Sequence, residues 1–268
     1  MARRSCVWIS GVGDGLPGAG PGGVDPALLR RVMPLFERLA RRHDHHVLGL
    51  ERVPDGPCLL VGYHGRPAID AFLLALTLYR RRGRAVRGIS HALWFGVPGM
   101  AGLCRGLGLV SGEEPRLGEL LAAGEPLMVL PGGSRECFRS SRVRYTLDWG
   151  QRQGYARLAL RHKLPIVLFV TEGADDLYEI YGDGYARSKR LTGTDMFPVC
   201  LPLGAHGLPF GPSRPVKLTT RLLGPILPDP AGPDPVAALD AEVRSGVNSL
   251  LKPLHERGEP GPRGLPWA

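Results

Sequence analysis

Short apolar runs alternate with helix-like segments along this chain, and this alternation constrains the fold more than any other feature. The runs at 58–63, 127–130 and 166–171 carry no charge and are rich in Leu, Val and Ile. They are too short for typical helices, and their composition is typical of strands buried on both faces. Because helix-like segments separate them, the sequence predicts an α/β fold, a single domain with a mostly parallel central sheet covered by helices.

The remaining patterns complete this alternating order. We expect further strands at 47–50, 86–90 and 216–222, and helices at 26–42, 69–82, 116–123, 149–162 and 235–252. The runs 88–104 and 196–213 carry no charge apart from histidines and are broken by Gly and Pro, which favours buried or interfacial loops. The 268 residues suit a Gly/Pro-rich N-terminal segment at 1–24, one domain at 25–252 and a Pro/Gly-rich tail at 253–268.

The chain is basic, with a net charge of +9 and an isoelectric point near 9.7. Such a charge favours an anionic partner: a membrane surface, nucleic acid or a phosphorylated cofactor. Composition explains the excess equally well, because only four of the 34 basic residues are lysines and arginine is common in chains rich in Gly, Ala and Pro. No basic segment is interleaved with aromatic residues, so we expect an anionic membrane surface and no nucleic acid.

The cysteines and histidines indicate neither disulfides nor a metal. The chain has scattered cysteines at positions 6, 58, 104, 137 and 200 and no Cys-x-x-Cys pair, which is typical of a reducing compartment. His43, His45 and His46 surround Asp44, but a polar helix end gives the same string without a metal. The apolar stretch after Arg4 is too short for a signal peptide, and no run reaches the roughly 18 residues of a spanning helix. We therefore expect a cytoplasmic protein that associates peripherally with membranes.

A histidine follows the apolar run that ends at Tyr63, and an aspartate comes six residues later, just inside the expected helix 69–82. His64 can accept a proton near neutral pH, and Asp70 can fix its tautomer and stabilise the imidazolium. The alternative is a surface histidine beside an aspartate that stabilises a helix N-terminus. Nothing nearby supplies a nucleophilic serine or cysteine in a recognisable setting. A base at His64 would therefore activate a hydroxyl that belongs to a substrate.

A glycine-rich loop follows the second buried run and comprises Pro131, Gly132, Gly133, Ser134, Arg135 and Glu136. The two glycines let backbone N–H groups approach a ligand closely, and Arg135 adds a cation with a planar fork. Such a loop suits an oxyanion or a phosphate, although a tight turn explains it equally well. Thr171 and Glu172 end the third buried run, at the sheet edge where sites of α/β proteins form.

Together, in this order and spacing, these segments resemble the glycerolipid acyltransferase family, the lysophosphatidate-acyltransferase-like group. His64 and Asp70 match the family's His–Asp motif, 131–135 matches its Pro-Glu-Gly-Thr-Arg block, and 164–167 matches its fourth block. The segment 47–54 resembles the strand and turn before the His–Asp motif. The strings at 130–136, 149–156 and 171–178 resemble the branch that includes diacylglycerol acyltransferases.

The resemblance implies an acyltransferase-like domain that moves a fatty acyl group from acyl-CoA or acyl carrier protein to a lipid hydroxyl. It implies His64 as the general base and Asp70 as the residue that orients it. It also assigns substrate binding to the loop residues Gly132, Gly133, Ser134, Arg135 and Glu136, with the glycines near the oxyanion and Arg135 near a donor phosphate. No cofactor beyond the thioester co-substrate, and no metal, is implied.

Three departures from the family pattern bear on the acceptor. Five residues separate the His and Asp where the family usually has four, Gly132 replaces a Glu, and an Arg is missing from the second block at 106–112. In enzymes with phosphate-bearing acceptors, that Glu and Arg help to bind the acceptor. Their loss favours a neutral acceptor such as diacylglycerol, unless Arg66 or Arg105 has taken over a phosphate.

Two other functions remain open at this stage. A lipid hydrolase would use water in place of the alcohol, although the chain lacks the Gly-x-Ser-x-Gly elbow of serine esterases. A catalytically silent lipid- or membrane-binding protein of the same fold is kept open by the unusual His–Asp spacing. Product analysis separates the three functions, because they yield an ester, a free acid or neither.

Overall fold

The computed structural model describes residues 24–257, except 84, 113–116, 183 and 194–197. Within them lies one seven-stranded sheet in the order β1-β7-β6-β2-β5-β3-β4. The strands are β1 (His46–Leu48), β2 (Leu59–Gly62), β3 (Arg87–Ser90), β4 (Leu109–Ser111), β5 (Leu127–Val129), β6 (Ile166–Glu172) and β7 (Thr219–Ile226). All neighbouring strands are parallel except β6 and β7, which are antiparallel. The predicted single α/β domain with a mostly parallel sheet is confirmed.

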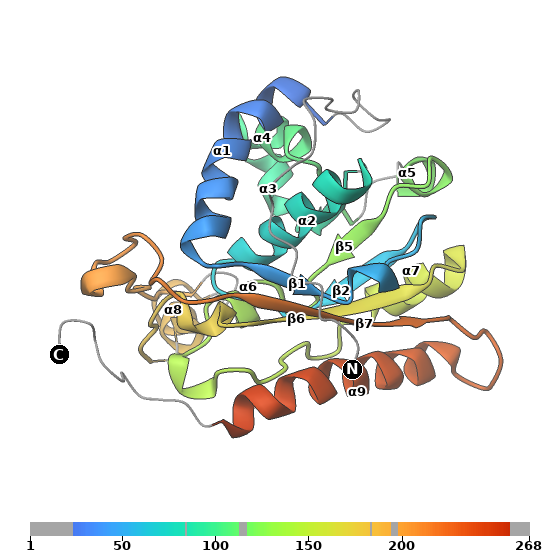
Figure 1. Cartoon of the computed structure of the whole chain (residues 1–268). Coiled ribbons are helices and arrows are strands. Elements are labelled where there is room, and N and C mark those ends of the chain that lie inside the picture. The colour runs from blue at the N-terminus through green and yellow to red at the C-terminus, as the bar shows by residue number, and fades with distance from the viewer. Residues whose placement is uncertain (1–23, 84, 113–116, 183, 194–197, 258–268) are drawn as a thin grey trace, which may run out of the picture.

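Helices cover both faces of this sheet (Figure 1). One side carries α1 (Pro26–Arg42), α2 (Ile69–Arg82), α3 (Leu93–Gly96) and α4 (Met100–Gly106), and the other carries α9 (Pro235–Glu256). The remaining helices are α5 (Leu117–Ala122), α6 (Gly133–Cys137), α7 (Gly154–His162) and α8 (Gly184–Thr192). Single 3₁₀ turns lie at Leu50–Arg52, Ser141–Val143, Ala174–Asp176 and Ala205–Gly207.

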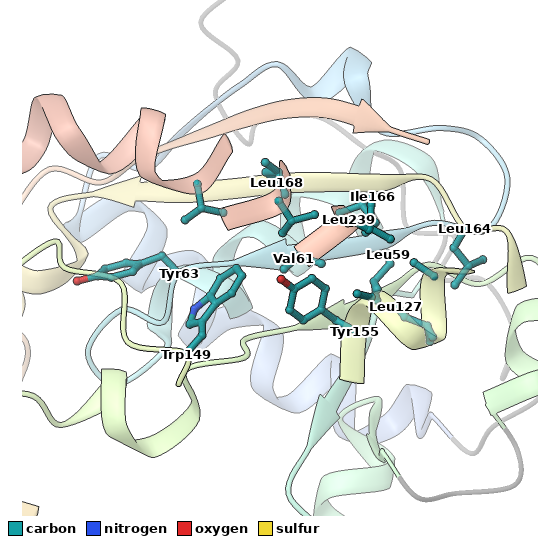
Figure 2. Close-up of a cluster of buried hydrophobic side chains, with 14 of the residues drawn as sticks. Leu59, Val61, Tyr63, Leu127, Trp149, Tyr155, Leu164, Ile166, Leu168 and Leu239 are labelled. Atoms are coloured by element: carbon teal, nitrogen blue, oxygen red, sulfur yellow. The ribbon is translucent and has the colours of Figure 1, made fainter. Parts of the chain in front are cut away.

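The central strand β2 divides the core into two parts. Its residues are all buried, and alternate side chains point to opposite faces of the sheet. Leu59 and Val61 belong to the cluster that α7 and α9 cover, where Trp149 and Tyr155 pack edge to face with ring centroids 5.4 Å apart (Figure 2). Leu60 belongs to the opposite cluster, which α2 covers. Burial on both faces explains why the run contains no polar side chain.

The largest errors of the sequence prediction fall in short or Gly/Pro-rich segments. Beyond the expected strand at 86–90, the run up to 104 was expected to form loops, yet it holds the helix α3 and most of α4. The three-residue strand β4 was not predicted, and helix α7 begins at Gly154 instead of 149. Helices this short present too few periodic positions to be recognised by pattern.

The C-terminal boundary also differs. The helix expected at 235–252 continues to Glu256, through Pro253, because Leu254 is buried in the core beyond it. The expected tail from 253 therefore overlaps α9, and the rest of it lies outside the described residues, as does nearly all of the N-terminal segment 1–24. Among the described helices, none combines the length and hydropathy needed to cross a membrane.

Candidate active site

The carboxyl ends of three neighbouring parallel strands bring the predicted motifs together. His64 follows β2, and Thr171 lies near the end of β6. The glycine-rich loop at 131–136, called the Pro-Gly-Gly loop from here on, follows β5. Strand β2 pairs with β5 on one side and with β6 on the other, in parallel register. The three motifs therefore meet at one edge of the sheet, which is where ligands bind in open α/β sheets.

A main-chain carbonyl sets the tautomer of His64. Its Nδ1 lies 2.8 Å from the carbonyl oxygen of Gly65, which also accepts the Ala68 N–H at 3.0 Å and so closes a turn. Because a carbonyl oxygen only accepts, Nδ1 carries the proton and Nε2 keeps its lone pair. Burial lowers the pKa of His64 to about 4, and Arg139 lowers it further while the Gly65 carbonyl opposes both. His64 is therefore neutral at pH 7 and can accept a proton at Nε2.

Asp70 is buried in the first turn of α2, with 1% of its surface exposed. Its place in the first turn is the one that the helix-terminus interpretation gave it, but the side chain is buried and not at the surface. No described residue donates a hydrogen bond to its carboxylate oxygens, so the direct His64–Asp70 hydrogen bond is not present among the described contacts. The carboxylate lies against Gly65, where a Cβ would come within 2.7 Å of its Oδ1. Burial raises the pKa of Asp70 to about 6, against the nearby Thr171 hydroxyl, which lowers it.

A second buried carboxylate, Asp175, anchors the segment that carries His64. It accepts hydrogen bonds from Arg139 at 2.8 Å, from the Tyr63 hydroxyl at 2.6 Å and from the Tyr145 N–H at 2.7 Å. Arg139 also donates to the His64 carbonyl at 3.1 Å. Sequence reasoning did not identify Arg139 or Asp175, because their roles depend on contacts between segments that lie far apart in the sequence.

Arg66 belongs to the same framework and not to the surface. It is 1% exposed, and it donates to the Ser141 hydroxyl at 2.7 Å and to the Asp175 carbonyl at 2.9 Å. Its ion pair with the Asp175 carboxylate spans 3.8 Å. The suggestion that Arg66 binds an acceptor phosphate is therefore wrong for this structure. Arg105 is exposed at the end of α4 and lies over the Phe95 ring at 5.5 Å.

The Pro-Gly-Gly loop divides into buried and exposed parts. Gly133 adopts φ +55°, and its N–H donates to the Leu130 carbonyl at 3.0 Å, so this N–H closes a turn and is not available to an oxyanion. Ser134 is half-buried, whereas Arg135 is exposed with its guanidinium 5.6 Å from the centre of the Tyr185 ring of α8. The loop is fixed from below by Arg152, which donates to the carbonyls of residues 131 and 132 at 3.2 and 3.0 Å.

Glu136 is a charged residue of this loop, and none of its surface is exposed. Its Oε2 accepts the His64 N–H at 3.0 Å, and its Oε1 accepts the Asp148 N–H at 2.9 Å. The expectation that this carboxylate contacts substrate does not fit its position in the structure.

The described residues contain no cluster that would hold a metal ion. The histidines before β1 bond within the fold instead: His43 to the Ser213 hydroxyl at 2.8 Å and His45 to the Thr220 hydroxyl at 2.9 Å. No disulfide joins the described cysteines.

The chain is similar to a protein-family model and to several known proteins. Residues 44–171 match the protein-family model named Acyltransferase. The chain is 31% identical over 192 residues to a human protein named "DGAT1/2-independent enzyme synthesizing storage lipids", with 70% of this chain and 55% of that protein covered. It is 32% identical over 144 residues to "Phytyl ester synthase 1, chloroplastic" of Arabidopsis thaliana, with 51% of this chain and 20% of that protein covered.

The chain spans about half the length of the first of these relatives. Among solved structures, it is similar to the 1-acyl-sn-glycerophosphate (LPA) acyltransferase PlsC from Thermotoga maritima, with a TM-score of 0.54 and 17% identity. That similarity covers 87% of this chain and 81% of the other. At this identity it establishes the shared fold and nothing further.

Proposed function

Because this chain belongs to the acyltransferase family, we propose that it transfers a fatty acyl group from a thioester donor to a neutral lipid hydroxyl. The donor is acyl-CoA or an acylated carrier protein, and diacylglycerol or another lipid alcohol is the acceptor. The observation that carries this proposal is His64, a neutral imidazole with an unprotonated Nε2 at the carboxyl edge of the sheet.

In the proposed reaction, Nε2 of His64 takes the proton of the acceptor hydroxyl as its oxygen attacks the thioester carbonyl. The carbon–sulfur bond then breaks, and the proton passes from the imidazolium to the departing thiolate. The negative charge of Asp70 stabilises the imidazolium, although it makes no direct hydrogen bond to it in this structure. Since Gly133 is committed to a turn, Gly132 is the glycine N–H that we assign to the developing oxyanion.

No acyl-enzyme is needed. Cys137 ends the helix of the Pro-Gly-Gly loop, but burial raises the pKa of its thiol to about 12. A thiol with that pKa is protonated at neutral pH and is a poor nucleophile. The acyl group therefore passes directly from the donor sulfur to the acceptor oxygen.

The arginines near the site support a neutral acceptor, because neither Arg66 nor Arg135 is left to bind a phosphate on the acceptor. Arg66 is buried and donates hydrogen bonds inside the fold. Arg135 is exposed beside the loop, where we assign it to a phosphate of the donor. A phosphate on the acceptor would need a matched cation of its own. The relatives named for storage lipids and phytyl esters are consistent with a neutral acceptor.

The decisive experiment incubates the purified protein with labelled acyl-CoA and a panel of acceptors. The panel contains diacylglycerol, a long-chain alcohol, glycerol 3-phosphate and lysophosphatidate at equal concentration. We expect ester formation with the first two, and His64→Ala should lower turnover by about two to four orders of magnitude. Free acid as the main product would indicate a hydrolase, and no product would indicate a silent binding protein. A preference for the phosphorylated acceptors would contradict the neutral-acceptor proposal and direct attention to Arg105.

We further propose that the protein works in the cytoplasm, attached peripherally to anionic membranes. The support is the net charge of +9 together with large apolar side chains on α3, α4 and the loop between them, where Trp94, Val97 and Leu103 are each at least 40% exposed. Each cation near an anionic surface contributes about 1 kcal/mol, and salt screens this attraction. Sedimentation with liposomes should therefore require anionic lipid and weaken as salt rises. Binding that ignores both would show that apolar insertion dominates.

A further inference from the structure

The main chain of His64 is held from both sides by buried charged side chains. Glu136 accepts its N–H at 3.0 Å, and Arg139 donates to its carbonyl at 3.1 Å. The second oxygen of Glu136 accepts the Asp148 N–H at 2.9 Å, so this carboxylate joins the end of β2 to the segment before α7. We propose that Glu136 is a positioning residue that fixes the catalytic imidazole through the backbone. We also propose that position 132 is a glycine because a larger residue would leave no space for the Glu136 side chain.

The steric part of this proposal rests on the contact between the two residues. A Cβ on Gly132 would lie 2.1 Å from the Cγ, Cδ and Oε2 atoms of Glu136. Its φ of −63° is accessible to any residue, so the backbone conformation does not require glycine here. What excludes a side chain at position 132 is the glutamate itself. The two positions are therefore one structural unit, in which the small residue makes room for the large one.

A negative charge on Glu136 is costly, because the side chain is fully buried. Burial raises the pKa of Glu136 to about 7, while Arg139 and the N–H groups of Asp148 and His64 lower it. The other groups that face it are the Trp149 indole and the Tyr63 ring. A buried carboxylate beside the reacting group, held by main-chain N–H groups, is typical of a functional site.

The consequence for the reaction is geometric. The main-chain N–H and carbonyl of His64 are each hydrogen-bonded to a buried side chain, and this fixes the position of the imidazole. A change at Glu136 therefore shifts the base relative to both substrates. A displacement of about 1 Å can cost on the order of 100-fold in rate. This argument rests on the proposed acyl transfer by His64, but the placement of the His64 main chain can be measured without it.

The kinetic test is a double-mutant cycle between positions 132 and 136. Glu136→Gln keeps the shape but presents an amide N–H to one of the two N–H groups, so kcat should fall by about 10- to 100-fold with both KM values within about threefold. Gly132→Ala should cause a similar fall, because the new Cβ displaces the glutamate. In a Glu136→Ala background the space is vacant, so Gly132→Ala should lower kcat by a clearly smaller factor than it does in the wild-type protein. Independent, multiplicative effects of the two substitutions would overturn the proposal.

Glu125→Gln is the matched control. Glu125 is likewise buried and pairs with an arginine, Arg87, but it lies away from the site, between α5 and β5. This variant should lose stability while its kcat stays within about twofold of wild type. An equal fall in kcat for both glutamate variants would show that a general loss of stability is responsible, and would overturn the positioning role.

Amide hydrogen exchange measured by NMR tests the same proposal without turnover. In Glu136→Gln the His64 amide should exchange at least about 10-fold faster, while the Leu60 amide inside β2 stays unchanged. If wild-type protein makes no ester but the His64 amide responds in this way, the proposed function fails and the placement of His64 by Glu136 stands. An unchanged His64 amide in a folded variant would overturn the placement itself.

Discussion

Two fully buried carboxylates lie close to the His64 loop and have opposite surroundings. Asp175 accepts hydrogen bonds from Arg139 at 2.8 Å and from Tyr63 at 2.6 Å. Burial alone would raise the pKa of Asp175, but Arg139 holds it below its usual range. Asp70 accepts no hydrogen bond from the described residues, and burial raises its pKa to about 6.

This difference indicates different roles for the two carboxylates, one in the structure and one in the proposed reaction. A buried charge whose partners are complete stabilises one arrangement of the chain, and its loss leaves those partners unsatisfied. A buried charge without partners lowers the stability of the fold, and such a residue is typical of a functional site. The difference is consistent with a framework role for Asp175 and with the proposed role of Asp70 in the reaction, and the following predictions test both roles.

The largest effect is expected on stability at the satisfied carboxylate. Asp175→Asn should lower the free energy of unfolding by about 3–5 kcal/mol, because two buried arginines lose their counter-charge. Urea denaturation measures this loss. Asp176→Asn is the control, since this side chain is one-third exposed and its loss should cost about 1 kcal/mol or less. Equal losses in the two variants would contradict the framework role of Asp175.

The second effect is on rate, at the unsatisfied carboxylate. Asp70→Asn should lower kcat by about 100-fold or more, because in the proposed reaction the charge of Asp70 stabilises the imidazolium. The same variant should unfold no more easily than wild type, because an uncompensated buried charge has been removed. Parallel assays of turnover and urea denaturation test both statements. Normal kcat together with reduced stability would assign Asp70 to the framework and erase the distinction.

The third effect is the pH dependence of stability, which should have opposite signs at the two sites. The folded-state pKa of Asp70 is about 6, above its usual value of 3.8, so the folded protein binds this proton more tightly than the unfolded chain. The loss of stability caused by ionised Asp70 is absent below about pH 4 and complete above about pH 6, where it amounts to about 1–3 kcal/mol. The stability advantage of Asp70→Asn over wild type should therefore grow between these pH values.

For Asp175 the sign reverses, because its folded-state pKa is lowered. Its contribution is present above the unfolded-state pKa and is lost as the pH falls through the folded-state value. The stability deficit of Asp175→Asn should thus shrink only in strong acid. Urea titrations of both variants at several pH values measure how the stability difference from wild type changes with pH. A change of the same sign in Asp70→Asn and Asp175→Asn would contradict the difference between the two carboxylates.

The smallest effect is expected at an exposed charge. Arg135 lies at the surface against Tyr185, so Arg135→Ala should leave stability within about 0.5 kcal/mol. If it holds a donor phosphate, KM for acyl-CoA should rise about 3- to 10-fold, and Arg135→Lys should restore this only in part because the planar fork is lost. Initial-rate kinetics with varied donor decide the matter, and an unchanged KM would leave Arg135 without a role in donor binding.

The sequence predicted the central sheet because burial on both faces leaves a local signature. The runs that became β2, β5 and β6 are uncharged and short, and the motif residues follow them directly. The short helices α3 and α4 left no such signature, because each spans two turns or fewer and Gly and Pro interrupt the run.

The candidate site was predictable in location but not in its internal bonding. That His64 and the Pro-Gly-Gly loop meet at one edge follows from the parallel sheet. The choice of the Gly65 carbonyl as partner of the imidazole does not, because it depends on the turn that the hydrogen bond from Ala68 to Gly65 closes. Nor does the contact of Glu136 with Gly132, which two neighbouring glycines in a sequence do not reveal.

The position of β2 also affects how the chain reaches its fold. This strand is made early, yet Leu59 pairs with Leu127 on one side and with Ile166 on the other. Such non-local pairing carries a loop-closure cost and slows folding. During synthesis the apolar strand stays unpaired at both edges until β5 emerges, and at one edge until β6 emerges. Unpaired strand edges promote aggregation. We therefore expect slow refolding from urea, and a strong dependence of soluble yield on chaperones when the protein is overproduced.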